Sequence, residues 1–197
     1  MKIEMADLSS RETHDLLTQS IAPLPIALIS TVGEDGVYNA APFSLVVPIS
    51  YKPPMVCVSF GLRRGQKKDT VRNIEHSRDF VINIMDESLI QSVIQTSSEY
   101  PSNVDEIKEV GLTAIASDKV KSPRIVEAQV SLECRLVQQF ELGEELRNVI
   151  FGEVVLVHVK DALWVNGSVD PYQVGVVGRL GTGIYCRTRD IFKAKAS

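Results

Sequence analysis

Residues 36–73 read GVYNAAPFSLVVPISYKPPMVCVSFGLRRGQKKDTVRN, and this stretch decides the fold. Small and polar residues gather at Asn39 to Ser44, and an apolar run of strand-forming residues follows at Met55 to Phe60. A basic loop, Gly61 to Lys68, then leads into Asp69-Thr70 and a short helical pattern. Small side chains let a ligand approach the backbone, and a basic loop that runs into a helix start suits a phosphate. The stretch therefore predicts a pocket for a long ligand with one flat, polar-edged end and one anionic end.

On the N-terminal side of this stretch, the pattern predicts a helix and then a β-hairpin. Ser9 and Glu12 fit a capping box for a helix over residues 9–20. Two apolar runs flank a turn at 33–36 that begins and ends with glycine, which is typical of a hairpin. The two strands of this hairpin are expected at 26–31 and 37–39.

Three small helices are expected on the C-terminal side, over residues 70–76, 87–95 and about 103–111. Asp69 and Asp86 are the expected N-caps of the first two. Asn103 and Glu106 resemble a capping box at the start of the third, and Gly111 suits the left-handed residue that ends a helix.

Strands dominate the rest of the chain. Further strands are expected at 43–49, 55–60, 80–85, 129–137, 149–159, 184–187 and 191–193, the first of them broken by Pro48. In 129–137 apolar residues alternate with Ser131 and Glu133, which predicts one buried and one polar face. Many short strands with small helices between them favour an antiparallel barrel or sandwich with helical insertions. We expect one domain over residues 1–197, with residues 1–22 as a helical extension.

The composition is that of a globular protein with an acidic balance. The 197 residues are 44% apolar and 23% charged, and the net charge is -4 at pH 7. An acidic chain argues against general nucleic-acid binding and makes a local basic loop more informative. No apolar run approaches the roughly 20 residues of a membrane helix, and the N-terminus lacks the apolar segment of a secretory signal. We therefore expect no nucleic-acid or membrane partner and a cytoplasmic location.

The cysteines and histidines favour neither a disulfide framework nor a metal site. They stand at Cys57, Cys134 and Cys186 and at His14, His76 and His158. The cysteines are odd in number and form no CxxC pair, and the histidines have no metal-ligand spacing. We predict no metal, a core position for Cys57 rather than a nucleophilic one, and a structural role for His158.

Five segments resemble the flavin reductase-like FMN-binding split-barrel family, which includes flavoredoxin. They are Asn39–Ser44, Ser50–Pro54, Ser59–Gly61, Lys68–Thr70 and, near the C-terminus, Gly178–Gly181 with Tyr185. The resemblance runs from about Pro23 to Phe192, and the order and spacing of the segments carry it. It implies a mainly β protein with short helices, folded as an antiparallel, Greek-key-like split β-barrel that binds FMN.

Each candidate binding segment also has a structural interpretation. The basic loop alone is typical of a solvated surface, and Asn39 with Pro42 is typical of a β-turn. The two segments together favour phosphate binding, and the resemblance favours flavin contact. The predicted FMN-binding residues are Thr31, Asn39, Ala40, Ala41, Pro42, Phe43, Ser44, Ser59, Gly61, Lys68, Asp69, Thr70, Arg179 and Leu180. Gly178 to Gly183 lacks the GxGxxG spacing and a surrounding βαβ unit, which excludes a Rossmann site.

The resemblance implies an FMN-dependent oxidoreductase that passes a hydride or electrons from NAD(P)H through the flavin to a free flavin or a redox protein. The cofactor would carry the chemistry, so no catalytic side chain is predicted. One alternative stays open at this point: an electron carrier of the flavoredoxin type without its own small substrate. The intact clusters at Lys68–Thr70 and Asn39–Ser44 argue against a third class, an interaction domain that has lost the ligand. The resemblance also implies a homodimer.

Overall fold

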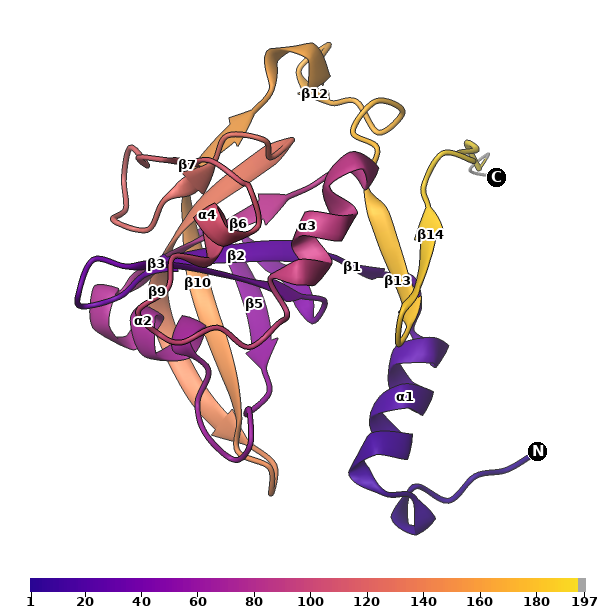
Figure 1. The fold of residues 1–197 in the computed structure, drawn as a ribbon. Coiled ribbons are helices and arrows are strands. Elements are labelled where there is room, and N and C mark those ends of the chain that lie inside the picture. Colours follow the sequence, from indigo (N-terminus) through magenta and orange to yellow (C-terminus); the bar gives the residue numbers. More distant parts are fainter. Residues whose placement is uncertain (195–197) are drawn as a thin grey trace.

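A computed structural model describes residues 1–194, and its largest element is a seven-stranded antiparallel sheet (Figure 1). In spatial order the strands are β3 (Tyr38–Phe43), β2 (Ala27–Val32), β6 (Asp79–Ile84), β9 (Val130–Leu142), β10 (Arg147–Val159), β5 (Pro54–Phe60) and β4 (Val46–Tyr51). A flat sheet of this width would separate its edge strands by roughly 29 Å, at about 4.8 Å per strand spacing. Only Ser44 and Leu45 join the edge strands β3 and β4, and three Cα steps reach about 11 Å. The sheet must therefore curl, and the predicted split barrel is confirmed.

The interior of the barrel is a dense apolar core. It is filled from β2, β3, β5, β6, β9 and β10, and helix α2 (Asp69–Ser77) adds Val71 and Ile74. The rings of Phe43 and Phe60 meet edge to face, with centroids 4.6 Å apart. Gly152 lies at a register shift of β10, where a Cβ atom would stand 2.5 Å from the Phe80 ring. A side chain at this position would displace the core.

A second apolar core covers the outer face of β2, β3 and β6. It packs Leu28 and Ala40 against helices α3 (Ile90–Gln95) and α4 (Glu106–Glu109) and against the segment 110–128. The short strands β7 (Ala114–Ile115) and β8 (Arg124–Ile125) pair within that segment. Strand β2 is thus buried on both faces, which accounts for its nearly continuous buried pattern.

The chain ends form a separate group beside the barrel. Strands β1 (Leu24–Pro25), β13 (Val177–Gly181) and β14 (Ile184–Arg187) make a three-stranded sheet, and helix α1 (Ser10–Ser20) packs on β13. Figure 1 shows α1 and the β13–β14 hairpin to one side of the barrel. The remaining elements are the 3-10 turns η1 (Met5–Asp7), η2 (Glu87–Leu89) and η3 (Asp161–Leu163) and the pair β11 (Trp164–Val165) and β12 (Ser168–Val169). Across residues 1–194, no helix combines the length and the apolar character needed to cross a bilayer.

Several local predictions are confirmed. Ser9 and Glu12 form the capping box of α1, and the Asp86 side chain caps η2 at the amide of Ser88. The hairpin turn is present, with Gly36 at φ +81°, and Gly111 has φ +73°.

Four other predictions are wrong. The N-cap of α2 is Lys68, and Asp69 is the first helical residue, where its carboxylate pairs with Arg72. Helix α4 begins at Glu106 with Asp105 as its side-chain cap, so Asn103 forms no capping box. Residues 191–193 form no strand. Pro48 lies inside β4 and does not end the strand, because an edge strand does not need its missing N–H group, although the pairing with β5 shifts register between Pro48 and Ser50.

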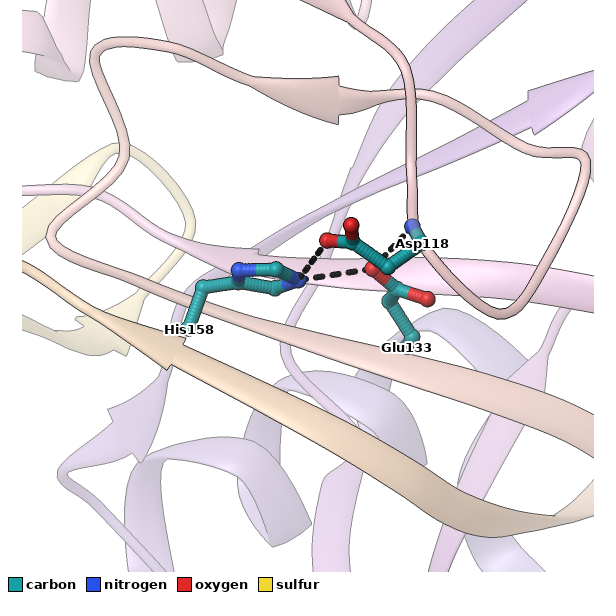
Figure 2. A group of neighbouring side chains, drawn as sticks. All are labelled: Asp118, Glu133 and His158. Carbon is teal, nitrogen blue, oxygen red and sulfur yellow. Dashed lines mark hydrogen bonds and ion pairs between the residues drawn. The ribbon is translucent and has the colours of Figure 1, made fainter.

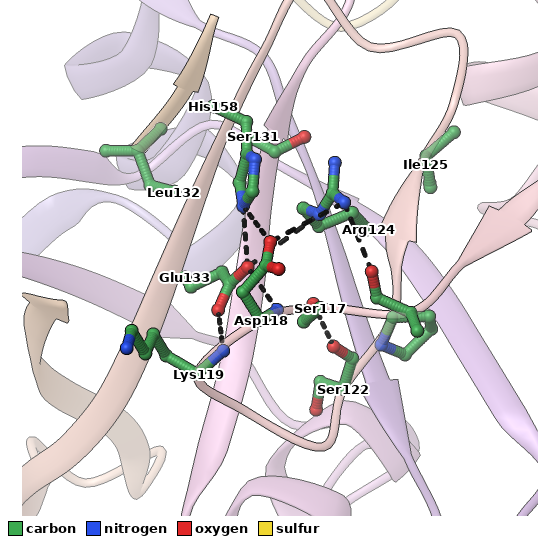
Figure 3. Close-up of polar contacts among 12 residues, drawn as sticks. Ser117, Asp118, Lys119, Ser122, Arg124, Ile125, Ser131, Leu132, Glu133 and His158 are labelled. Atoms are coloured by element: carbon green, nitrogen blue, oxygen red, sulfur yellow. Dashed lines mark hydrogen bonds and ion pairs between the residues drawn. The ribbon is translucent and has the colours of Figure 1, made fainter. Parts of the chain in front are cut away.

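The polar face of β9 is covered rather than open to solvent, since Ser131 and Glu133 are buried at 4% and 0% exposure. The segment 116–124 lies over them (Figure 3). The Glu133 carboxylate accepts hydrogen bonds from the backbone amides of Asp118 at 2.9 Å and Lys119 at 2.6 Å. Buried acceptors with good donors hold this loop against the sheet, so polar residues on a strand can mark a buried face.

His158 on β10 completes this group (Figure 2). Its Nε2 lies 2.7 Å from Glu133 Oε1 and 3.3 Å from Asp118 Oδ2. The predicted structural role of His158 agrees with these contacts. Cys57, on β5, is half-buried, and its burial raises the pKa of the thiol, which favours the unreactive protonated form.

Replacing the buried carboxylate tests the loop attachment. Burial raises the pKa of Glu133, but hydrogen bonds from Asp118, His158 and Lys119 outweigh it and hold the pKa below its ordinary value of 4.5. Glu133→Gln should lower the free energy of unfolding at pH 7 by about 1.5–3 kcal/mol, the range for hydrogen bonds to charged groups. A carboxyl group whose pKa is lowered by folding stabilises the folded protein at pH values above the pKa of that group in the unfolded chain. The difference in unfolding free energy between wild type and Glu133→Gln should therefore shrink as the pH falls below about 4.5.

Urea unfolding at pH 7 and pH 4 measures this difference. Glu144→Gln, at an exposed position of the β9–β10 turn, is the matched control and should change little. Equal stabilities of wild type and Glu133→Gln at pH 7 would contradict the assignment.

Candidate functional site

Two cavities adjoin on the outer side of β3, where Pro42 and Ser97 line both of them. The first, called here the basic cavity, has a volume of about 220 Å³. Its lining residues are Asn39, Ala41, Pro42, Leu62, Arg63, Lys68, Asp69, Thr70, Thr96, Ser97, Ser98 and Glu106. The second, called here the apolar cavity, has a volume of about 280 Å³. Its lining residues are Ile26, Pro42, Ser44, Ile90, Val93, Ile94, Ser97, Arg179, Thr182, Gly183 and Tyr185.

The basic cavity faces the start of α2. The first amides of this nine-residue helix, those of Asp69 and Thr70, have no intrahelical acceptor and lie at the positive end of the helix dipole. Lys68, the N-cap, has its Nζ 5.0 Å from the Phe43 ring centroid. Burial, and then the neighbouring cations Arg63 and Arg147, lower the pKa of Lys68. An anion in the cavity would offset both effects, so this end is suited to a phosphate.

A hydrogen-bonded group of three side chains also lines the basic cavity. The Asn39 amide lies between Thr70 and Glu106, 3.1 Å from the Thr70 hydroxyl. The Glu106 carboxylate accepts a 2.9 Å hydrogen bond from the Ala40 amide and is only 6% exposed. Burial raises the pKa of Glu106 to about 7 against the lowering effect of the Ala40 amide. The basic cavity therefore holds both a cation and a carboxyl group that titrates near neutrality.

The apolar cavity has a wall from α3 and a rim from the C-terminal hairpin. Ile90 and Ile94 of α3 line it together with Arg179 of β13 and Tyr185 of β14. Figure 1 shows α3 between the barrel and this hairpin. Arg179 Nε donates to the Gly181 carbonyl at 3.1 Å, which fixes the side chain at the rim. An apolar slot with polar groups at its margin suits a flat ring.

The structure brings eight of the fourteen predicted residues to these cavities: Asn39, Ala41, Pro42, Ser44, Lys68, Asp69, Thr70 and Arg179. The other six lie behind or beside them. Thr31 is buried and accepts a hydrogen bond from Asn73, while Ala40 and Phe43 belong to the two cores. Ser59 and Gly61 lie beside Arg147, whose Nε donates to the Ser59 hydroxyl at 3.2 Å. Leu180 is half-buried in β13.

The sequence prediction missed Arg63, Thr96, Ser97, Ser98 and Glu106 as cavity residues. Arg63 belongs to the basic loop Gly61–Lys68, so its charge alone could have identified it as a candidate phosphate-binding residue. The serines follow α3 and carry no pattern of their own. Glu106 was interpreted as a helix-capping residue, and its contact with Ala40 joins positions 66 residues apart. A local pattern gives no signal for such a contact.

The structure also brings together Asp118, Glu133 and His158, which the sequence left far apart. Their nearest donor atoms all lie within 4.8 Å of one another, so a cation could be held there by geometry alone (Figure 2). However, the Arg124 guanidinium lies 3.7 Å from Glu133 and 3.8 Å from Asp118 (Figure 3). A protein cation thus already compensates the two carboxylates, and this group is best described as the ion cluster that holds the loop.

Comparison with known proteins agrees with the fold. Residues 20–173 match the family described as the flavin reductase like domain. An uncharacterized protein of Aquifex aeolicus is 33% identical over 189 residues, 95% of each chain. The structure of nitrilotriacetate monooxygenase component B from Bacillus cereus is 31% identical, with 98% of each chain covered and a TM-score of 0.94. That of Pseudomonas fluorescens 2-nitrobenzoate 2-nitroreductase is 28% identical, with 100% of this chain and 96% of the other covered and a TM-score of 0.91.

The family match covers most of the chain, and the fold agrees over almost its whole length. The sequence resemblance rested on the order and spacing of five segments, and among them Asn39–Ser44 and Lys68–Thr70 contribute residues to the cavities beside β3. The chain belongs to the flavin reductase-like domain family, with the split-barrel fold.

Proposed function

We propose that this protein binds FMN and passes a hydride or electrons from NADH or NADPH through the flavin to a second acceptor, a free flavin or a redox protein. The observation that carries the proposal is the pair of adjoining cavities, one basic and one apolar, joined at Pro42 and Ser97. Family membership supports it, as do the names of two similar structures, a monooxygenase component and a nitroreductase.

The residues present fit FMN. Lys68, Thr70 and the first amides of α2 would hold the phosphate, and the small side chains of Pro42 and Ser44 leave room for the ring in the apolar cavity. The basic cavity has a single helix start beside Lys68, which favours a ligand with one phosphate, FMN, over FAD. When bound, the flavin supplies the redox chemistry by accepting a hydride or electrons and releasing them. The protein orients the ring and keeps one of its faces accessible.

The ring face must admit a nicotinamide for the reductase reaction. Ser44, Arg179 and Tyr185 border the apolar cavity, and Tyr185 is 36% exposed at the rim. A nicotinamide has to approach the flavin to roughly 3–3.5 Å for hydride transfer. An exposed rim residue can move aside for such a ligand, which supports the reductase function.

A second copy of the chain is the proposed partner. The edge strand β4 has unpaired backbone groups on its outer side and three exposed apolar side chains: Val47 at 50%, Ile49 at 44% and Tyr51 at 88%. An exposed apolar edge strand readily pairs with another chain, and natural proteins usually cover such an edge. A twofold dimer, the commonest symmetry, would cover this strand in both copies.

The phosphate end is tested by comparing ligands. Lys68→Ala and Thr70→Val should weaken FMN binding by about one to two decades, the equivalent of roughly 1.5–3 kcal/mol. Riboflavin lacks the phosphate, so its affinity should change much less. Titration calorimetry with FMN, riboflavin and FAD measures all three, and FAD should bind more weakly than FMN.

Arg64→Ala is the matched control, because Arg64 carries the same charge in the same loop but is 81% exposed and pairs with Glu99. It should leave FMN affinity nearly unchanged. Equal losses of FMN and riboflavin affinity in the Lys68 variant would contradict a phosphate contact, and tighter binding of FAD would contradict the choice of FMN.

The reaction is tested by anaerobic stopped-flow mixing of the FMN-loaded protein with NADH and with NADPH. Bleaching of the flavin absorbance is the expected result. If neither nucleotide reduces the flavin while a reduced ferredoxin-like protein does, the protein is an electron carrier instead.

The dimer is tested by light scattering on the FMN-loaded protein. Wild type should have twice the mass of the chain, and Val47→Glu should shift it toward the monomer because a charge at a buried interface is unfavourable. Val126→Glu, at a 49% exposed apolar position outside β4, is the control and should remain dimeric. A monomeric wild type at full FMN occupancy would contradict the proposal.

A further inference from the structure

A buried carboxyl group lies where the proposed phosphate would bind. Glu106 is 6% exposed and lines the basic cavity together with Lys68 and Arg63. A carboxylate next to a dianionic phosphate is repelled, and burial removes the water that would screen the repulsion. Cap formation does not explain this residue, because the side-chain cap of α4 is Asp105.

Both hydrogen bonds described for the Glu106 carboxyl group go to Oε2, and neither goes to Oε1. Oε2 accepts from the Ala40 amide at 2.9 Å. With the Asn39 amide nitrogen turned toward Glu106, Nδ2 donates to the same oxygen at 3.2 Å, and Oδ1 accepts from the Thr70 hydroxyl at 3.1 Å. Oε1 receives neither bond, so it can carry a proton without disturbing the contacts of Oε2.

Charged groups from three directions act on this carboxyl. Arg63 of the basic loop favours the charged form, while Asp69 of α2 and Asp105 before α4 favour the neutral one. Lys68, whose own pKa is affected by Glu106, faces the same cavity. With its pKa raised to about 7, chiefly by burial, Glu106 is poised between its two forms near neutral pH. A bound phosphate adds negative charge beside it and shifts the balance toward the neutral form.

We propose that Glu106 takes up one proton from solvent when the phosphate of FMN enters the basic cavity, and that the neutral carboxyl then donates a hydrogen bond to a phosphate oxygen. This inference rests on the proposed function, because it takes FMN as the ligand. It makes Glu106 a specificity residue that accepts a phosphate monoester and couples its binding to pH. Below pH 7 the Glu106 carboxyl group already carries the proton. Above pH 7 each FMN that binds must be accompanied by one proton from solvent, so the affinity for FMN should fall by up to tenfold for each unit by which the pH rises.

Proton uptake is measured by titration calorimetry with FMN at pH 8 in two buffers of different ionisation enthalpy. At this pH the phosphate is already dianionic, since its second pKa is about 6. Wild type should take up close to one proton per FMN, and riboflavin, which has no phosphate, should cause almost no uptake. Glu106→Gln keeps the acceptor for the Ala40 amide and should bind FMN with almost no uptake and with a flat pH profile between 7 and 9.

Glu109→Gln is the matched control, because Glu109 lies on the same short helix but is exposed, and it should behave as wild type. Thermal unfolding checks the fold of each variant. A raised carboxyl pKa means that the charged form is unfavourable in the folded protein. Glu106→Gln should therefore be more stable than wild type at pH 8, where the glutamate is charged, and its stability advantage should be smaller at pH 5.

The outcomes separate this inference from the proposed function. FMN binding without proton uptake by wild type, or with equal uptake by wild type and Glu106→Gln, would overturn the role of Glu106 while leaving FMN binding intact. In the second case Lys68 would be the group that takes up the proton. No binding of either FMN or riboflavin would overturn both the proposed function and this inference.

Discussion

The link between β3 and β4 is the constraint on which the rest of the structure depends. Ser44 and Leu45 alone connect the two edges of a seven-stranded sheet, so the sheet has to curl until those edges come close. Closure places the small residues of β3 at the split in the barrel, and α2 fills the interior through Val71 and Ile74. The start of α2 then lies against β3, where Asn39 meets Thr70. The site is thus a consequence of how the sheet closes.

The second determinant is that the central strands are buried on both faces. A strand buried on both faces must satisfy every polar group it carries, because water cannot reach them. Asn83 of β6 does so with four contacts, donating to the Leu28 carbonyl and the Ser30 hydroxyl and accepting from the Ile125 amide and the Ser131 hydroxyl. Glu133 does the same for the amides of Asp118 and Lys119. These bonds fix the outer segment in one register against the sheet.

The outer layer in turn supplies half of the candidate site. Helix α3 forms the wall of the apolar cavity, and α4 brings Glu106 against β3. The same layer that excludes water from the central strands therefore removes water from the carboxyl group of the anion site. Burial shifts the pKa values of Lys68 and Glu106 in opposite directions, because it favours the neutral form of each: it lowers the pKa of Lys68 and raises that of Glu106. A phosphate bound as proposed would favour the charged form of Lys68 and the neutral form of Glu106, so a single anion suits both.

The sequence by itself determined the features that arise from neighbouring residues. Turn glycines, the Ser9–Glu12 capping box and the strand patterns are local, and they were enough to predict an antiparallel barrel or sandwich with helical insertions. The family resemblance narrowed this to the split barrel and, with the basic loop before Asp69-Thr70, pointed to eight of the cavity residues. Only the tertiary structure decided which faces were covered. Alternation in β9 distinguishes Ser131 and Glu133 from their apolar neighbours, but a polar residue with buried hydrogen-bond partners has the same pattern as one in water. The contact between Glu106 and Ala40 likewise joins positions 66 residues apart, and it exists because the barrel closes and α4 packs on its outer face.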